Sequence, residues 1–343
     1  MIGRGKKNIL EGWTRRDFLR GMIQGGIALT GSSWLSGCEK RFGYVDTFVT
    51  KLRDYEADIS SAILSGFREL KVDRAEIKGK RILLKPNLIE PHSGAGHINT
   101  HPMVVRGAVE AFLRFGASEV TVAEGPGHSR DSLLVLDESG LGEVLLEDRI
   151  PFVDLNYESA ITVPNAGRYM RLRELVLPAI LRQSDWIVSM PKMKTHHWAG
   201  VTLSMKNLFG VMPGAYYGWP KNVLHWEGIE NCIFDIHATV RPHFSIMDGI
   251  VGMEGDGPIL GAPHHAGVLV MGRNLPAVDA TSARIMGIDP AKVKHLTLAS
   301  GRLGPIRESS ILQRGEKIEA VRSDFALEEK IHAQKGIGLS ESP

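Results

Sequence analysis

Residues 185–214 read DWIVSMPKMKTHHWAGVTLSMKNLFGVMPG, a short apolar run followed by a dense set of basic and polar side chains. The apolar run WIVSM does not alternate with polar positions, which is typical of a strand buried on both faces of a parallel sheet. In such sheets, ligands bind beyond the carboxyl ends of the strands. The segment therefore predicts a central strand and a binding or active site directly after it.

Strand-length apolar runs alternate along the chain with segments whose apolar residues recur at helical spacing. We expect strands at 81–88, 119–124, 152–155, 186–190, 244–247 and 267–271. We expect helical segments at 52–70, 103–115, 133–146, 228–239, 278–286 and 292–300, and a hairpin from 311–312 and 318–321. The alternation predicts an α/β fold: a single compact domain with a mostly parallel sheet, helices on both faces and a small C-terminal hairpin.

Polar side chains follow four of the predicted strands, at the point where each strand ends. Together with those of the segment after WIVSM, they are Lys85, Asn87, Glu124, Lys192, Lys194, His196, Lys206, Asn207 and Asp248. Because the carboxyl ends of parallel strands meet at one edge of a sheet, we expect these side chains to line a single cleft. For each lysine taken singly, a side chain that only extends along the surface is the alternative.

The residue types in this cleft indicate a small anionic ligand, because lysines spaced among glycines suit a phosphate or carboxylate better than a cation. The expected ligand-binding residues are Lys85, Asn87, Lys192, Lys194, Lys206 and Asn207. The expected catalytic residues, which would handle protons, are Glu124, His196 and Asp248. Adjacent side chains on a strand point to opposite sides, so at most one of His196 and His197 should face the cleft.

Oxygen and imidazole ligands also suit divalent metal ions. The candidate ligands are Glu124, His128, His196, Asp248 and Glu254, although the same side chains can line a polar cleft without a metal. Part of this set lies in DGIVGMEGDGPILGAPHH, residues 248–265, which five glycines and two prolines predict to be an irregular loop. The turn EGPGH at 124–128 is equally compatible with a tight strand-to-helix connection.

The N-terminus has the order of an export signal. Residues 14–20, TRRDFLR, match the twin-arginine pattern, and the uncharged run at 21–36 leads into LSGC, which ends like a lipoprotein signal at Cys38. That run is too polar for a stable membrane span. We therefore expect a twin-arginine export signal at 1–37, a tether at 38–51, the α/β domain at 52–325 and a tail at 326–343.

These features predict an extracytoplasmic protein anchored to the membrane by a lipid on Cys38, on the periplasmic side if the cell is Gram-negative. The twin-arginine translocase is then an expected partner. Residues 1–37 carry a net charge of +4, which leaves −2 for the rest of the chain, so the composition does not indicate nucleic-acid binding.

The cysteine count limits the chemistry further. The chain of 343 residues contains two cysteines, Cys38 and Cys232, so it cannot supply the thiolates of an iron–sulfur cluster or build a disulfide framework. Lys206 lacks the preceding glycine run of a nucleotide P-loop, and G-x-G-x-x-G follows none of the expected strands. The hydrophobic content of 43% and charged content of 23% are ordinary for a soluble globular protein.

Five stretches carry a family resemblance that covers about residues 80–304. In chain order they are LLKPNL, THPMVVRGAVEAFLRFGASEVTVAEGPG, PKMKTHHWAGVTLSMKNLFG, MDGIVGMEGDGPILGAP and PAVDATSARIMGIDP. The chain resembles the bacterial and archaeal family called domain of unknown function 362. The resemblance implies an α/β domain and no settled reaction; the ferredoxin-like cysteine cluster attached in many members is missing from this chain.

The chain also has a fainter similarity to nickel-pincer lactate racemases. Gly127-His128-Ser129-Arg130 and the series His196, Gly200, Lys206 resemble their cofactor surroundings, although the racemase turn has no serine between its histidine and arginine. Three functions stay open: an enzyme of unassigned reaction acting on a small anion, a non-catalytic ligand-binding or cofactor-delivery protein, and a racemase-like proton-transfer enzyme.

Overall fold

The computed structural model describes residues 43–127 and 131–339, which all belong to one compact unit. The expected export signal, Cys38 and His128 lie outside the described residues. Within the described part of the chain, none of the helices has both the length and the apolar character needed to cross a membrane.

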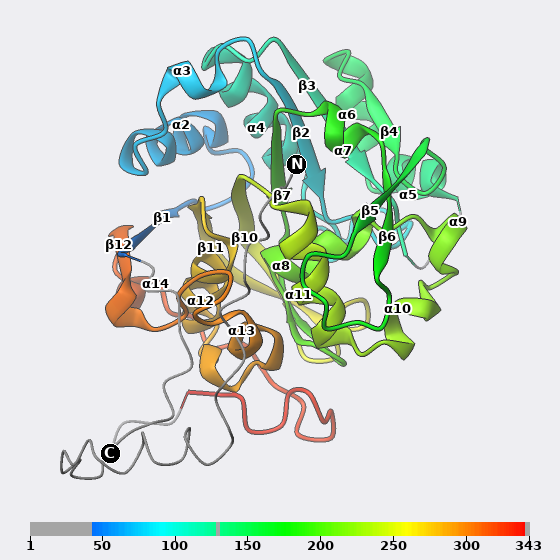
Figure 1. Ribbon diagram of the computed structural model, residues 1–343. Helices are drawn as coiled ribbons and strands as arrows, with labels where there is room; N and C mark the ends of the chain where they lie inside the picture. Colours follow the sequence, from blue (N-terminus) through cyan, green and yellow to red (C-terminus); the bar gives the residue numbers. More distant parts are fainter. Residues whose placement is uncertain (1–42, 128–130, 340–343) are drawn as a thin grey trace, which may run out of the picture. The chain divides into compact units, whose positions relative to one another are not determined.

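A ten-stranded sheet forms the centre of the unit, with the strand order β12-β1-β11-β10-β7-β2-β3-β4 and with β8 and β9 added beside β10 (Figure 1). Its strands are β1 (Val45–Lys51), β2 (Arg81–Pro86), β3 (Glu119–Glu124), β4 (Phe152–Asp154), β7 (Trp186–Met190), β8 (Lys192–His196), β9 (Gly200–Thr202), β10 (Phe244–Glu254), β11 (Ala262–Gly272) and β12 (Ile311–Gly315). β5 (Ala160–Pro164) and β6 (Glu174–Pro178) form a separate antiparallel pair. Most strand pairs of the large sheet are parallel, as predicted.

Helices cover both faces of the sheet, which confirms the predicted fold class (Figure 1). The longer helices are α2 (Ile59–Glu69), α4 (Pro102–Arg114), α5 (Ser132–Glu138), α6 (Leu141–Glu147), α11 (Ile229–Val240), α12 (Leu275–Ile285) and α13 (Lys294–Ala299). The short ones are α3 (Arg74–Ile77), α7 (Ile180–Gln183), α8 (Ser204–Asn207), α9 (Gly214–Tyr217), α10 (Asn222–Trp226) and α14 (Ile318–Val321). α2 and α4 pack on one face, whereas α11, α12 and α13 pack on the other.

β7 is buried along its whole length, as its apolar run predicts. Val188 belongs to the hydrophobic core under α2 and α4, and the neighbouring Ile187 belongs to the core under α11 and α12. Successive strand side chains point to opposite faces, so a strand covered by helices on both sides needs an apolar residue at almost every position.

The C-terminal hairpin is a wrong prediction. Residues 311–315 form β12, which pairs in parallel with β1, and Ile318–Val321 forms the helix α14. The reason is β1 itself, which falls in the segment expected to be a tether: it lies between β11 and β12 and provides backbone partners to both. Because β1 and β12 lie far apart in the sequence, no local sequence pattern indicates that they pair.

The irregular loop expected at 248–265 is also a wrong prediction, since most of it belongs to the long antiparallel pair β10 and β11. Gly249 and Gly252, inside β10, serve close packing, whereas Gly255 has φ +76° in the connection that remains between the two strands. A Cβ atom at Gly252 would lie 2.6 Å from the carbonyl oxygen of Met193, so only glycine fits beside β8 at this position.

The last described residues pack onto the domain instead of forming a frayed tail. The Gln334 amide donates a hydrogen bond to the carbonyl oxygen of Gly255 (2.8 Å), and the backbone N–H of Ala326 donates to Glu254 (2.9 Å). The described part of the segment expected to be a tail is therefore continuous with the folded unit.

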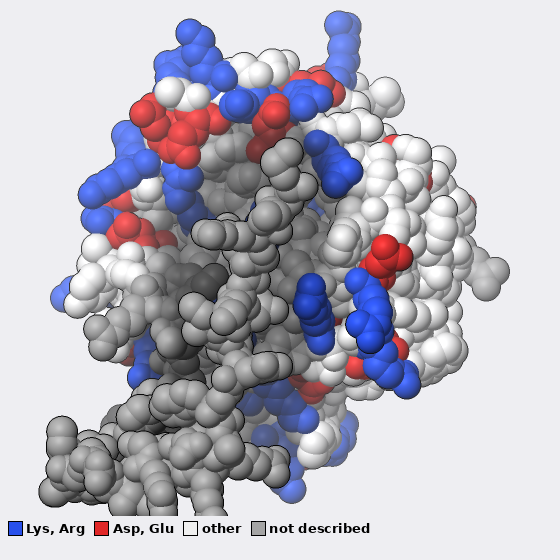
Figure 2. Space-filling model, viewed as in Figure 1, with Lys and Arg blue, Asp and Glu red and all other residues white. Residues whose placement is uncertain are grey.

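Charged side chains of both signs are interspersed on the described surface visible in Figure 2. Surface ion pairs also occur, as between Arg106 and both Glu147 (2.5 Å) and Asp148 (2.7 Å). Such exposed pairs contribute little to stability, so the fold depends mainly on the two apolar cores.

Candidate functional site

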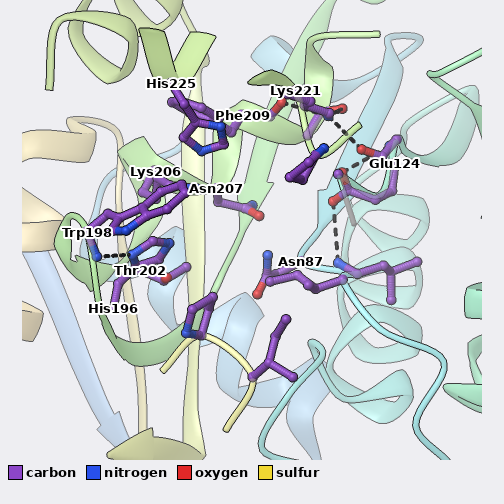
Figure 3. Close-up of a pocket in the computed structure, with 18 of the residues that line it drawn as sticks. Asn87, Glu124, His196, Trp198, Thr202, Lys206, Asn207, Phe209, Lys221 and His225 are labelled. Carbon is purple, nitrogen blue, oxygen red and sulfur yellow. Dashed lines mark hydrogen bonds between the residues drawn. The ribbon is translucent and has the colours of Figure 1, made fainter. Parts of the chain in front are cut away.

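A cavity of about 150 Å³ lies beyond the carboxyl ends of β2 and β3. Of the predicted site residues, Lys85, Asn87, Glu124, His196, Lys206 and Asn207 line it. Figure 3 shows Glu124 and Lys221 on one side, His196, Trp198 and Thr202 on the opposite side, and Asn207 between them. The sheet thus brings residues far apart in the sequence to one edge, where ligands of α/β proteins usually bind.

A buried ion pair between Lys85 and Glu124 forms the floor of this site. The Lys85 Nζ atom contacts Glu124 Oε2 and also donates to Asn207 Oδ1 (2.8 Å), and both charged side chains are almost fully buried. Burial lowers the pKa of Lys85, and the charge of Glu124 opposes this shift. Glu124 is therefore the counter-ion of Lys85 and is not free to act as a separate base.

Gly210 allows this ion pair to approach the backbone. A Cβ atom at Gly210 would overlap Glu124 Oε1 and lie 2.5 Å from Lys85 Nζ. Asn207 fixes the same region from the other side, because its Nδ2 atom donates to the Lys85 carbonyl oxygen and to Ser189 Oγ, both at 3.0 Å. The segment KNLFG thus needs its asparagine and its glycine for geometric reasons.

Asp279 of α12 sets the position of α8, which carries Lys206. Its carboxylate accepts hydrogen bonds from the backbone N–H groups of Ser204 (2.7 Å) and Met205 (2.9 Å), which are otherwise unpaired donors at the start of a helix. Asp279 is fully buried, and burial raises its pKa to about 7. Sequence reasoning missed this support, because Asp279 looks like an ordinary polar residue of a helix.

Lys206 is a cation that faces the cavity without a counter-ion. Its Nζ atom lies 4.2 Å from the centre of the Phe209 ring, and no described residue accepts a hydrogen bond from it or forms an ion pair with it. Burial, and next the charge of Lys85, lower its pKa to about 8. The ammonium group is protonated at neutral pH and is available to an anion.

Lys221 is a third lysine in the cavity wall, after Lys85 and Lys206, and sequence reasoning missed it. Its Nζ atom donates to the backbone carbonyl oxygens of Gly125 (2.7 Å) and Phe209 (2.9 Å), and burial lowers its pKa to about 7. It follows no strand, so the rule that located the other site residues does not apply to it. Its backbone has φ +66°, unusual for a residue with a side chain.

Three more polar groups of the cavity lining lack a partner among the described residues. Asn87 Oδ1, Thr202 Oγ1 and His225 Nδ1 are buried without a hydrogen bond. Unpaired buried polar atoms are costly and commonly receive a ligand or a water molecule. Thr202 and His225 were not predicted, since Thr202 lies inside the short strand β9 and His225 on the short helix α10.

Both His196 and His197 line the cavity, which contradicts the expectation for adjacent strand residues. The strand β8 ends at His196, and the chain turns there, so strict alternation no longer holds. His196 Nδ1 accepts hydrogen bonds from the N–H groups of Trp198 (3.0 Å) and Ala199 (3.2 Å). Burial holds the pKa of His196 well below its usual value, so the ring is neutral and carries its proton on Nε2.

Lys192 and Lys194 do not line the cavity, contrary to prediction. Lys192 forms a fully buried ion pair with Asp248 (2.6 Å), and Lys194 donates to the carbonyl oxygens of Ile98 (2.8 Å) and Pro258 (3.2 Å). Both lysines hold backbone segments beside β8 and β10. The predicted catalytic residue Asp248 therefore lies outside the cavity and belongs to a structural ion pair.

The candidate metal ligands that the structure describes, Glu124, His196, Asp248 and Glu254, do not assemble. No group of three His, Cys, Asp or Glu side chains positioned to hold a metal ion occurs in residues 43–127 and 131–339. The carboxylates have other partners: Glu124 pairs with Lys85, Asp248 with Lys192, and Glu254 with His264 Nδ1 (2.6 Å). The arrangement of the described candidates thus does not support the metal site considered from the sequence.

Fold and cavity together define an α/β protein with a basic, histidine-containing cavity at the carboxyl edge of its sheet. The chain belongs to the family described as Domain of unknown function (DUF362), which matches residues 82–284. It is 29% identical over 234 residues to a thylakoid-associated protein of Synechocystis sp., an alignment that covers 66% of this chain and 68% of that protein.

Two solved structures match part of this chain. The lactate racemase apoprotein from Thermoanaerobacterium thermosaccharolyticum has a TM-score of 0.42 at 14% identity, with 72% of this chain covered. A protein from Thermotoga maritima has a TM-score of 0.35 at 14% identity, with 60% of this chain covered. The chain spans 58% and 52% of the lengths of these two proteins, respectively.

Proposed function

We propose that the protein binds a small anionic molecule in the cavity, and that Lys206 contacts the negative charge. The observation that carries this proposal is the ammonium group of Lys206, which faces the cavity and has no acceptor among the described residues. A carboxylate or phosphate would satisfy it through a charge-assisted hydrogen bond. Asn87 and Thr202 add buried polar atoms with open hydrogen-bonding capacity on the same lining.

The bound anion is to be identified by purifying the full-length chain from its host and analysing released small molecules by mass spectrometry. Its affinity is then measured by calorimetry between pH 6 and pH 10. An enzyme changes the bound molecule during incubation, whereas a non-catalytic binding or delivery protein returns it unchanged. Failure of the wild-type chain to retain or bind any carboxylate, phosphate or sulfate would count against the proposal.

Lys206→Met is expected to weaken anion binding at pH 7 by at least about tenfold, since a hydrogen bond to a charged group is lost. For the wild type, affinity should fall about tenfold per pH unit above pH 8. The sign follows from the pKa of about 8, because only the protonated ammonium attracts the anion. Lys206→Met should remove this fall in affinity above pH 8. Lys221, whose pKa is about 7, is unchanged in the variant, so any pH dependence that it causes is common to both proteins.

The melting temperature of Lys206→Met should stay the same or rise, because removing Lys206 relieves its repulsion with Lys85. A lower melting temperature with unchanged anion affinity would assign Lys206 to the structure instead.

Proton transfer on the bound anion is the second candidate function, and the pair His196 and Lys206 favours it. Lys206 has a pKa of about 8, so it can give a proton to the bound anion as the ammonium and take one back as the amine, while the Nε2–H group of neutral His196 can donate a hydrogen bond to the same anion. Glu124 does not take this role in our proposal, because Lys85 occupies it.

We further propose that the chain is exported by the twin-arginine translocase and anchored through a lipid on Cys38. The signal-like order of residues 14–38 supports this, as does a relative named as thylakoid-associated. Changing Arg15 and Arg16 to lysine together should leave the precursor in the cytoplasm, and Cys38→Ser should leave the exported protein without its membrane anchor. Cell fractionation measures both; normal arrival of the double-lysine variant in the envelope would refute twin-arginine export.

A further inference from the structure

A second basic site lies at the opposite edge of the sheet. A groove of about 710 Å³ runs between the end of α11, the start of α12 and the residues after α13, and Arg241, Arg273 and Arg302 line it. Glu76 holds Arg273 through two hydrogen bonds (2.7 and 3.0 Å). No described carboxylate lies within ion-pair distance of Arg241 or Arg302, so the groove carries two uncompensated guanidinium groups.

The backbone at Arg241 supports a role for its side chain. Arg241 ends α11 in the left-handed region, with φ +52°, where glycine is the residue of lowest conformational cost. Its Nε atom donates only to Ala238 in the preceding turn (3.3 Å). Arg302 lies 5.9 Å from the ring centre of Tyr169, which also lines the groove. A long cationic side chain thus occupies a position that the fold alone would give to glycine.

The location of the groove indicates the source of its ligand. β1 begins at Val45, and its Thr47 pairs with Gly272, the residue before Arg273, so the start of β1 lies beside the groove. Cys38 precedes Val45 by seven residues, which reach at most about 25 Å. A lipid on Cys38 would therefore keep this edge near the membrane surface.

We propose that the arginine groove binds the phosphate of an acidic phospholipid headgroup, through Arg241 and Arg302. Guanidinium groups match phosphate oxygens in geometry and charge, and each arginine near an anionic membrane adds measurably to binding. The groove is separate from the cavity around Lys206, so the site does not depend on the proposed anion chemistry there. In the anchored protein, the headgroup contact turns the opposite edge, with the cavity, away from the bilayer.

The test uses the full-length chain with Cys38→Ser, so that lipid attachment does not contribute. Calorimetry compares soluble dihexanoyl-phosphatidylglycerol, dihexanoyl-phosphatidylcholine and inorganic phosphate as probes. We expect the phosphatidylglycerol to bind and the phosphatidylcholine not to bind. Arg241→Gly and Arg302→Ala should each weaken phosphatidylglycerol binding about fivefold.

Arg182→Ala is the matched control, since Arg182 lies on α7, at the same edge but outside the groove. It should change the affinity less than twofold. Arg241→Gly removes the positive-φ strain, so its melting temperature should not fall, and Arg302→Ala alters an exposed side chain.

Several results would overturn the proposal. The first is that phosphatidylglycerol does not bind. The second is that it binds equally well to both groove variants and to the wild type. The third is that Arg182→Ala loses as much phosphatidylglycerol affinity as the groove variants. Binding of inorganic phosphate that Arg241→Gly and Arg302→Ala both weaken, without binding of phosphatidylglycerol, would show that the groove serves a small phosphate instead of a lipid; phosphate binding that only Lys206→Met weakens belongs to the cavity. Loss of anion binding at Lys206 has no bearing on these readouts, so the two proposals can fail independently.

Discussion

Asp248→Ala is expected to lower the free energy of unfolding by about 3–5 kcal/mol, because it leaves the ammonium of Lys192 buried without a counter-ion. Both side chains of the pair are fully buried, and the Nζ and Oδ2 atoms are 2.6 Å apart. Asp248 also accepts hydrogen bonds from the Tyr55 hydroxyl (3.2 Å) and the His101 N–H (3.0 Å). Burial raises the pKa of Tyr55, so its hydroxyl stays protonated and keeps donating.

Urea denaturation of the full-length chain measures this effect. Asp46→Ala is the control, since Asp46 pairs with Arg314 while both side chains are about 30% exposed, and its loss should cost less than about 1 kcal/mol. If Asp248→Ala lost no more stability than Asp46→Ala, Lys192 would have to be neutral in the folded protein. The Asp248 carboxylate would then not be needed as a counter-ion, and the structural role assigned to it would be wrong.

Gly210→Ala is expected to weaken anion binding by about 100-fold, the largest effect of a single methyl group in this site. The added Cβ atom overlaps Glu124 Oε1 and approaches Lys85 Nζ to 2.5 Å, so the buried ion pair has to move. Displacements of about 1 Å in a binding or catalytic arrangement can cost about 100-fold. Overpacking should also lower the free energy of unfolding by about 1–3 kcal/mol.

Gly127→Ala provides the matched control in the same cavity lining. Its added Cβ atom would meet the Lys221 side chain at 3.6 Å, an ordinary van der Waals contact. Calorimetry should find the affinity of Gly127→Ala within about threefold of the wild type, since no group has to move. Equal affinities of Gly210→Ala and wild type, in folded protein, would show that the Lys85–Glu124 pair does not shape the binding site.

Local pattern predicted the centre of the fold but not its edges. β3 and β7 have the predicted bounds, because a strand covered on both faces needs a continuous apolar run. β1 was missed and the strand at 311–312, part of β12, was given the wrong partner, since both strands pair with segments far along the chain. The pairing of β10 with β11 was hidden by glycines typical of loops, of which Gly249 and Gly252 instead allow close packing inside β10.

The candidate site was predictable where a polar residue directly follows a central strand. Lys85, Asn87 and Glu124 lie at the ends of β2 and β3 in this way, and all three line the cavity. Lys192 and Lys194 also follow a strand, but they lie on β8, a short continuation whose direction the sequence does not specify. Lys221 could not be located by this rule, because it follows no strand and its ammonium group is held by the carbonyl oxygens of Gly125 and Phe209.

Three lysines and one glutamate line the cavity, so its lining has more basic than acidic side chains. Lys85 and Glu124 neutralise each other, whereas Lys206 and Lys221 add positive charge that no other lining carboxylate offsets among the described residues. An anion that enters the cavity therefore takes the place of an acidic side chain that the chain does not encode. In that sense a bound anion would contribute to the interior of the domain as a buried acidic side chain does.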